Sequence, residues 1–417
     1  MQLKRVVVTG LGAITPLGNT VADYWENLVK GVSGAAPITQ FDASKFRTQF
    51  ACEVKGFDPV QFMDRKEARK IDRFTQFALV ASDQAMADAG LNKENINPDR
   101  VGVVFASGIG GLITFQQEVM EFAKGDGTPR FNPFFIPKMI LDIAAGQISM
   151  RHNLRGPNFA VVSACASSTN AMIEAYNLLR LGKADIIVSG GSEAVISEAG
   201  VGGFNAMKAM SERNDDPTTA SRPYDKDRDG FVMGEASGVV ILETLEHALA
   251  RGAKIYCEIA GGGATADAYH ITAPHPDGLG AQNVMRVALE DAGMQPKDID
   301  YINTHGTSTP LGDIAEVKAI VNVFGQHAYD LNISATKSMT GHCLGAAGVI
   351  EAIACIKSVV HDIVPPTINH FTDDPDLDSK LNFTFNKAQT RTIHAALSNT
   401  FGFGGHNACV IVKKYVA

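Results

Sequence analysis

Residues Phe159–Asn170 read FAVVSACASSTN, and this stretch decides the fold class. Phe159–Ser163 has the apolar, β-branched character of a buried strand, and the residues from Ser167 onward begin an alanine-rich helix. A strand that passes directly into a helix is the unit of an α/β protein. Cys165 lies at this junction, where a helix N-terminus can stabilise a thiolate. The position predicts a nucleophile, with a small buried cysteine as the alternative.

The same alternation continues along the chain and predicts a mainly parallel sheet covered by helices. Several predicted helices end at a glycine, as left-handed C-caps require. The predicted strands are Val6–Thr9, Val101–Ala106, Phe159–Ser163, Asp185–Ser189, Ser237–Leu242, Ile255–Ala260, Ile299–Asn303, Leu331–Ser334 and Ala408–Val412, and the predicted helices are Phe74–Ala89, Ser167–Leu181, Ala281–Ala292, Ile314–Phe324 and Gly348–Val360.

A weak internal repeat divides the chain. Ala87–Leu91, a polar loop and the strand at Val101 parallel Glu290–Met294, a polar loop and the strand at Ile299. Two α/β halves, 1–253 and 254–417, are therefore predicted, although helix–glycine–strand is also common punctuation.

Composition limits the class of protein. The chain has 417 residues, 45% of them apolar, and a net charge of −8, so it should repel nucleic acid and anionic membranes. Its six cysteines are scattered without a CxxC pair, which argues against disulfides and zinc and predicts a reducing cytoplasm. Apolar runs fall short of a membrane span, and glycines interrupt the N-terminal run, so neither membrane insertion nor export is expected.

Two further segments place polar residues where strands end. Asn303–Asp313 reads NTHGTSTPLGD and contains His305, and Ser334–His342 reads SATKSMTGH and contains Lys337 and His342. Strand ends converge on one site in α/β sheets, so these side chains are expected to meet Cys165. Each histidine alone has a simpler explanation as a surface or satisfied core residue.

A glycine-rich segment lies near the C-terminus. Ser398–Asn407 reads SNTFGFGGHN, and its glycines permit close backbone approach. Such a loop could offer an N–H group to an oxyanion and carry a movable aromatic side chain. A plain β-turn is the alternative.

A basic cluster occupies helical spacing. Lys66, Arg69, Lys70 and Arg73 would share one face of a helix. In an acidic protein this face suits an acidic partner, or it is merely solvated.

Together these motifs resemble the signatures of the 3-oxoacyl-[acyl-carrier-protein] synthases, over essentially the whole chain. The resemblance implies a thiolase-like α/β fold, with duplicated halves in a five-layered α-β-α-β-α core, and a homodimer. It also implies a synthase II activity: decarboxylative condensation of malonyl carrier protein with an acyl chain on Cys165, extending fatty acids by two carbons without a cofactor or metal. A specialised polyketide or aryl-polyene condensing enzyme is the alternative. A non-catalytic chain-length-factor subunit would lack the cysteine.

The resemblance also assigns roles. Cys165 is implied as the acylated nucleophile, His305 and His342 as the decarboxylating pair, and Phe403 as the gate whose N–H joins that of Cys165 in an oxyanion hole. Lys337 is implied as a fourth catalytic residue, which tunes the local electrostatics. Other implied groups are the network Glu351 and Asp313; the substrate-binding Thr272, Thr307 and Thr309; the acyl-pocket residues Ile109, Phe204 and, across the dimer, Ile136; and the carrier-protein contacts Lys66, Arg69, Lys70, Arg130 and Lys208. Thr304, Cys343 and His406 depart from the commonest family pattern.

Glycine pairs elsewhere imitate nucleotide-binding motifs. Gly10-Leu-Gly12 and Gly108-Ile-Gly110 lack the third glycine of a dinucleotide fingerprint, and Gly261–Gly263 lacks the lysine of a phosphate loop. His270 and His275 have no third ligand at metal spacing. No nicotinamide, phosphate or metal site is predicted from them.

Overall fold

The computed structural model describes residues 3–416 and contains one ten-stranded mixed sheet with helices on both faces. Its strand order is β10-β9-β13-β14-β8-β1-β7-β6-β4-β5. The first half of the chain contributes β1 (Val6–Ile14), β4 (Val101–Ala106), β5 (Asn158–Val161), β6 (Ile186–Glu193) and β7 (Ala236–Thr244). The second half contributes β8 (Cys257–Ala266), β9 (Tyr301–Asn303), β10 (Asn332–Ser334), β13 (Ala395–Gly402) and β14 (His406–Lys413).

The two halves repeat one topology. If the strands of each half are numbered in chain order, both run third, second, fourth, fifth, first from the outer edge inward. The halves join where β1 pairs antiparallel with β8. The duplication is therefore confirmed in the fold, and the predicted boundary at 253/254 lies between α9 (Leu245–Ala250) and β8.

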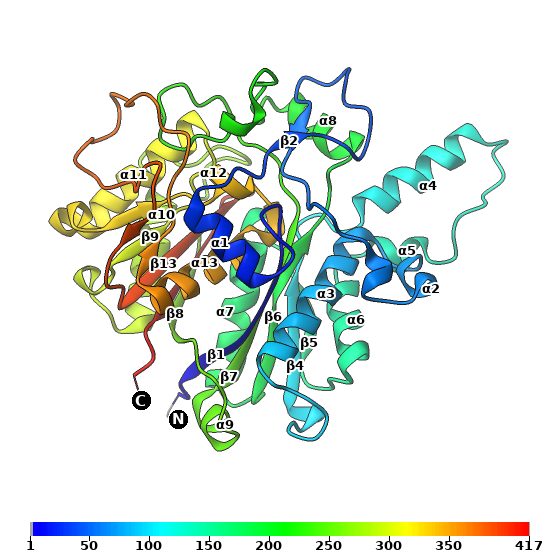
Figure 1. Cartoon of the computed structure of the whole chain (residues 1–417), viewed down its shortest axis with the longest axis horizontal. Coiled ribbons are helices and arrows are strands. Elements are labelled where there is room, and N and C mark those ends of the chain that lie inside the picture. The colour runs from blue at the N-terminus through cyan, green and yellow to red at the C-terminus, as the bar shows by residue number, and fades with distance from the viewer. Residues whose placement is uncertain (1–2, 417) are drawn as a thin grey trace.

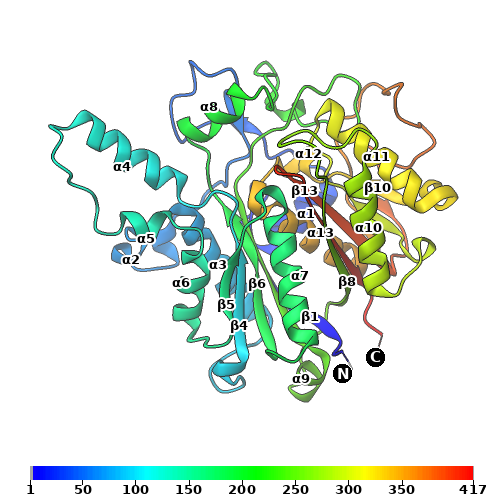
Figure 2. The same ribbon diagram turned by 180° about the vertical axis from the view of Figure 1, so that it is seen from behind.

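The helices form three layers around the two half-sheets (Figures 1 and 2). α7 (Ser167–Arg180) and α13 (Ala347–His361) lie between the halves and share one apolar core with strands of both. α3 (Arg73–Asp88) and α6 (Ile143–His152) cover the outer face of the first half, and α10 (Leu279–Ala292) and α11 (Pro310–Phe324) that of the second. This gives the expected α-β-α-β-α order.

Further elements decorate this core. They are the helices α1 (Val21–Lys30), α2 (Arg65–Ala68), α4 (Leu112–Lys124), α5 (Phe135–Met139), α8 (Glu198–Ala206) and α12 (Lys337–Thr340), and the short strand pairs β2 (Ala36–Pro37) with β3 (Phe50–Ala51) and β11 (Ile363–Val364) with β12 (Gln389–Thr390). α4, the loop after it and α5 form an arm, residues 112–139, that projects from the body (Figure 2).

The prediction of a mainly parallel sheet was wrong. β7 runs antiparallel to both β1 and β6, and β14 runs antiparallel to both β8 and β13. All of β1, β6 and β7 is buried, so these strands carry continuous apolar runs that resemble parallel ones. β13 was also missed, because the predicted glycine loop Ser398–Asn407 contains the end of this strand.

The imitation nucleotide motifs have a packing role. A Cβ at Gly10 or Gly12 of β1 would lie 2.4 or 1.9 Å from a carbonyl oxygen of α3, and one at Gly261 or Gly263 of β8 would lie 2.5 or 2.6 Å from the backbone of α10. Glycine therefore lets the first strand of each half approach its covering helix closely.

One helical segment within residues 3–416, Leu344–His361, is long and apolar enough to cross a membrane, and 83% of it is buried inside the protein. The segment is α13 with its preceding turn, so its apolar surface belongs to the core. The expectation that no run approaches this length holds for unbroken runs only, because Glu351 and Lys357 interrupt this one.

Candidate active site

Cys165 lies in a tight turn between β5 and α7. Ala164–Ala166 form a 3₁₀ turn, and Ala164 takes a positive φ of 52°, which is unfavourable for a residue with a Cβ. The Ser167 hydroxyl fixes the turn, since it donates to the Ala164 carbonyl at 2.6 Å and accepts from the Ser163 N–H at 2.8 Å. The turn thus holds the sulfur at the start of the central helix.

Burial controls the thiol. Cys165 is 8% exposed, and burial raises its pKa to about 12. The charge of Lys337 and the backbone N–H groups of Phe403 and Cys165 oppose this rise. The expectation of a stabilised thiolate was therefore wrong for the resting protein, because desolvation outweighs the helix N-terminus.

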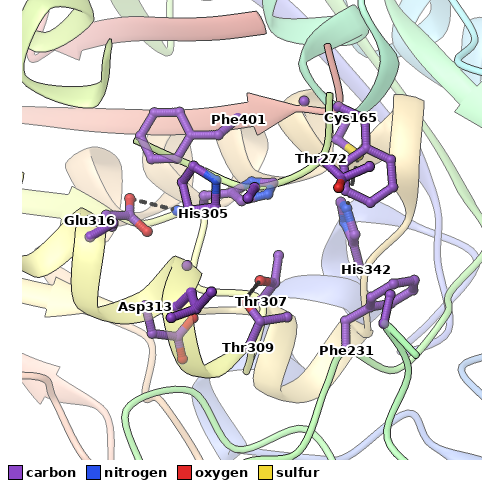
Figure 3. Close-up of a pocket in the computed structure, with 18 of the residues that line it drawn as sticks. Cys165, Phe231, Thr272, His305, Thr307, Thr309, Asp313, Glu316, His342 and Phe401 are labelled. Atoms are coloured by element: carbon purple, nitrogen blue, oxygen red, sulfur yellow. Dashed lines mark hydrogen bonds between the residues drawn. The ribbon is translucent and has the colours of Figure 1, made fainter. Parts of the chain in front are cut away.

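Two imidazoles stand beside the sulfur (Figure 3). His342 Nε2 lies 3.1 Å from Cys165 Sγ. The His305 ring is perpendicular to that of His342, with centroids 5.2 Å apart. The three segments predicted to converge do so here.

Local structure sets each ring. Glu316 of α11 holds the His305 turn by accepting the N–H groups of His305 and Gly306, both at 2.9 Å. The backbone N–H of His342 donates to the Val232 carbonyl at 2.7 Å, and Phe231 packs edge-on to the imidazole with centroids 5.4 Å apart.

Both imidazoles are neutral near pH 7. Burial first, and the charge of Lys337 second, hold the pKa of each well below its usual value. Lys337 is 1% exposed, and its Nζ donates to Glu351 Oε1 at 2.5 Å. Burial also raises the pKa of Glu351 to about 7, against the pull of Lys337.

A cavity of about 460 Å³ connects these groups to the surface. It brings together ten of the site residues predicted from the sequence, which are Cys165, Phe204, Lys208, Thr272, His305, Thr307, Thr309, Asp313, His342 and Phe403. Lys337 and Glu351 do not line the cavity, and the charge of Lys337 acts on Cys165, His305 and His342.

Phe403 occupies a tight turn beside the sulfur. The turn Phe403–Gly405 joins β13 to β14, and Gly404 and Gly405 have φ of 88° and 74°. A Cβ on Gly402 would lie 2.6 Å from the Ser163 carbonyl oxygen, so this position requires glycine. The Phe403 and Phe204 rings lie 6.3 Å apart, and together they form an aromatic wall.

The threonines line the outer part of the cavity. The Thr307 and Thr309 hydroxyls are 3.0 Å apart. Asp313, whose pKa burial raises to about 6, accepts from the Tyr224 N–H and pairs with Arg228 behind them. Thr272 lies across the cavity in the loop after β8 (Figure 3).

Two predicted acyl-pocket residues lie outside this cavity. Ile109 is 36% exposed, in the loop after β4, and Ile136 is 54% exposed, in α5 of the arm. Ile136 was expected to act across a dimer, so a single chain does not test its role.

The basic cluster does not share one helical face. α2 ends at Ala68, and Asp72 starts a separate helix by capping α3. Arg73 is engaged by the buried Glu235, with its Nη2 2.7 Å from Oε1. Lys66, Arg69 and Lys70 stay exposed, as do Arg130 on the arm and Lys208 at the cavity.

Glu316 and Phe231 also line the cavity, and neither was predicted from the sequence. Burial raises the pKa of Glu316 to about 7. Its position one helical turn after Asp313 was the available signal. Phe231 carried none, because it follows a charged loop rather than a strand.

Solved structures similar to this chain include ketosynthases. One, 33% identical over the full length of both chains with a TM-score of 0.91, is the ketosynthase of a type II polyketide synthase in complex with its acyl-carrier protein and bound to a hexaketide. A beta-ketoacyl synthase from Burkholderia phymatum is 34% identical, covering 99% of this chain and 100% of its own, with a TM-score of 0.92.

The chain belongs to the beta-ketoacyl synthase family, whose N-terminal domain matches residues 3–248 and whose C-terminal domain matches residues 256–371. It is 51% identical, over 100% of this chain and 99% of the relative, to a Synechocystis protein named 3-oxoacyl-[acyl-carrier-protein] synthase 2. It is 49% identical, over 100% of both chains, to the Staphylococcus aureus protein of that name.

Proposed function

We propose that the protein is a 3-oxoacyl-[acyl-carrier-protein] synthase that joins malonyl carrier protein to an acyl chain held on Cys165, with loss of carbon dioxide. The observation that carries the proposal is the 3.1 Å approach of His342 Nε2 to Cys165 Sγ, with His305 beside it at the base of one cavity. The roughly 50% identity to proteins named for this activity supports it.

The first step transfers the acyl chain to sulfur. A thiol with a pKa of about 12 is protonated at rest, so its proton leaves as the sulfur attacks the acyl thioester. His342 Nε2 is placed to take this proton and pass it to the departing carrier thiol. The N–H groups of Phe403 and Cys165 act on the sulfur and are placed to donate to the oxyanion.

The second step releases carbon dioxide. Breaking the malonyl C–C bond leaves an electron pair that becomes an enolate, with negative charge on the thioester oxygen. Two neutral imidazoles can each donate an N–H to this oxygen, His342 from the tautomer that carries its proton on Nε2 rather than the Nδ1–H tautomer that serves as base in the first step, and each donor is worth about 3 kcal/mol. The carbanion then attacks the acyl carbon, and Cys165 sulfur is the leaving group.

The lining of the cavity indicates where the substrates would bind. Thr307, Thr309 and Thr272 line its outer part, where a phosphopantetheine arm would pass, and Phe204 and Phe403 flank the sulfur where an acyl chain would begin. Exposed Lys66, Arg69, Lys70, Arg130 and Lys208 would bind an acidic acyl carrier protein. We assign no bound metal or cofactor, because thiol, imidazoles and N–H groups supply every step.

A homodimer is part of the proposal. β5 is an edge strand whose Phe159 is 39% exposed, and Val162 just after it is 55% exposed. The arm also exposes apolar side chains, which are Phe115, Val119, Met120, Phe122, Phe131, Phe134 and Ile136. An exposed strand edge and an exposed apolar patch both favour association with another chain. A second copy bound there would bring Ile136 to its neighbour's acyl pocket. All six cysteines are free and buried, which suits the cytoplasm.

Fatty-acid elongation is the proposed pathway rather than polyketide synthesis, because the proteins named 3-oxoacyl-[acyl-carrier-protein] synthase 2 are more similar in sequence to this chain, at 51% and 49% identity, than the polyketide ketosynthase, at 33%. The test is a ladder of acyl-carrier primers of increasing length with malonyl carrier protein. We expect 3-oxoacyl products two carbons longer than each saturated primer. Preference for aromatic or polyketide primers would contradict the pathway, and no product from any primer would contradict the activity.

A further inference from the structure

Glu193, at the end of β6, is a fully buried acid with an unusual set of partners. It is 0% exposed, and no cation contacts its carboxylate among the hydrogen bonds and ion pairs of residues 3–416. Every partner is a donor. The Ser107 hydroxyl donates at 2.8 Å, and the backbone N–H groups of Gly108, Ile109, Gly110 and Gly345 donate at 2.8, 3.1, 3.2 and 3.0 Å.

These donors come from both halves of the chain. Ser107–Gly110 follow β4, whereas Gly345 lies in the turn Leu344–Ala346 between His342 and α13. A Cβ on Gly345 would lie 2.3 Å from the Gly108 N atom, and one on Gly108 would lie 3.3 Å from the Ala164 carbonyl oxygen. The backbone of the Ile109 loop therefore packs directly against the turns that carry Cys165 and His342. The Glu193 carboxylate accepts hydrogen bonds from this loop and from the turn after His342.

We propose that Glu193 is a positioning residue that holds the Ile109 loop against both catalytic turns and so sets the acyl side of the Cys165 site. The proposal rests on the proposed function, because it assigns Ile109 to the acyl pocket. A buried charge is tolerated only when hydrogen bonds satisfy it, and the ionised carboxylate can accept all five donors. With glutamine at position 193, a side-chain NH₂ in place of Oε2 would face the N–H groups of Gly108 and Gly345, which donate and cannot accept.

The charge of Glu193 also reaches the nucleophile. Glu193 raises the pKa of Cys165, whereas Lys337 lowers it. The neighbouring His342 is neutral, so these two charges oppose each other at the sulfur. Burial is the largest cause of the raised thiol pKa, and the charge of Glu193 adds to it.

The test uses Glu193→Gln, Glu193→Asp and, as a control at a distant buried acid whose carboxylate pairs with Arg251, Glu243→Gln. Glu243 is equally buried and sits at the other end of the β6–β7 ladder, roughly 20 Å away at about 3.3 Å per residue. The rate of Cys165 alkylation by iodoacetamide is measured at pH values from 7 to 10, with peptide mapping as the readout and Cys165→Ala as the blank. The acyl-primer ladder is measured in parallel on the folded proteins.

We expect Glu193→Gln to speed alkylation of Cys165 severalfold at each pH, because removing the negative charge lowers the thiol pKa. Glu193→Asp keeps the charge, so its alkylation rate should match the parent while its primer preference shifts with the loop. Glu243→Gln should change neither. Parental alkylation and primer preference in folded Glu193→Gln would overturn the proposal.

Ser107→Ala covers the case in which Glu193→Gln does not fold. This change removes one donor to Glu193 and the hydroxyl that accepts the Gly110 N–H at 3.0 Å. A shifted primer preference with parental alkylation would support the proposal, and an unshifted preference would count against it. Alkylation does not require condensation, so a parent protein that alkylates normally but is never acylated would contradict the proposed function alone.

Discussion

Replacing His305 by alanine should slow malonyl decarboxylation far more than it slows acylation of Cys165. Of the two histidines, His342 is the one within hydrogen-bonding distance of the sulfur, at 3.1 Å, whereas the His305 ring faces the His342 ring. His305→Ala therefore removes one of two donors to the enolate oxygen. At about 3 kcal/mol for a donor, malonyl decarboxylation should slow by on the order of 100-fold. Acylation of Cys165 should fall much less.

The assay measures both steps on one preparation. Carbon dioxide release from malonyl carrier protein reports decarboxylation, and intact mass after incubation with an acyl donor reports acylation. His342→Ala is the companion variant, and it should slow both steps while retaining some acylation, because the same imidazole serves the sulfur. If His305→Ala releases carbon dioxide at the parental rate, or loses acylation as completely as decarboxylation, the assignment of the two histidines is wrong.

Three further changes test other parts of the account. Lys337→Met removes the cation that lowers the pKa of His342, so the loss of acyl transfer in acid should move up toward pH 6.5; an unmoved pH profile would refute that role. Arg69→Glu should raise the KM for carrier-borne substrates about tenfold and leave the KM for small pantetheine thioesters unchanged. Arg155→Glu should leave the KM for both kinds of substrate unchanged. An equal rise in the KM for carrier-borne substrates in the two variants would exclude a specific docking patch. Gly12→Ala, whose Cβ would lie 1.9 Å from the Ala81 carbonyl oxygen, should lower the free energy of unfolding by about 2–4 kcal/mol in urea, while Gly146→Ala in α6, with open space around it, should not destabilise the protein.

Local patterns predicted the elements that carry strong local signals. The strand at Val101–Ala106 has the predicted bounds, and α7 begins at Ser167 as expected. The parallel between Ala87–Leu91 and Glu290–Met294 marked a true duplication, because both segments lead from a covering helix to the second strand of their half. The meeting of Cys165, His305 and His342 followed from one rule, that strand ends converge.

Other features depend on partners that are distant in the sequence. Antiparallel and parallel strands look alike when both faces are buried, so the direction of β7 was not readable from its residues. Lys66–Arg73 has helical spacing, yet Asp72 divides it by capping a new helix, and a buried Glu235 far along the chain takes Arg73. The resting state of Cys165 was misjudged for the same reason, since its pKa depends on desolvation by the whole fold.

Glu193 is the clearest example of a residue whose role cannot be predicted from local sequence. Its sequence context, at the end of an apolar strand, predicts nothing about a site. Its five donors come from two segments that lie more than eighty residues before it or more than a hundred after it. Only the folded chain shows that one carboxylate touches the surroundings of both catalytic turns.

The central claim is that Cys165 carries the acyl chain during condensation. Intact mass and peptide mapping after incubation with an acyl carrier donor, followed by addition of malonyl carrier protein, test it directly. We expect the parent to gain the acyl mass on Cys165 and then to lose it as a 3-oxoacyl product appears, while Cys165→Ala shows neither change. An acyl adduct on another residue, or condensation by folded Cys165→Ala, would contradict it.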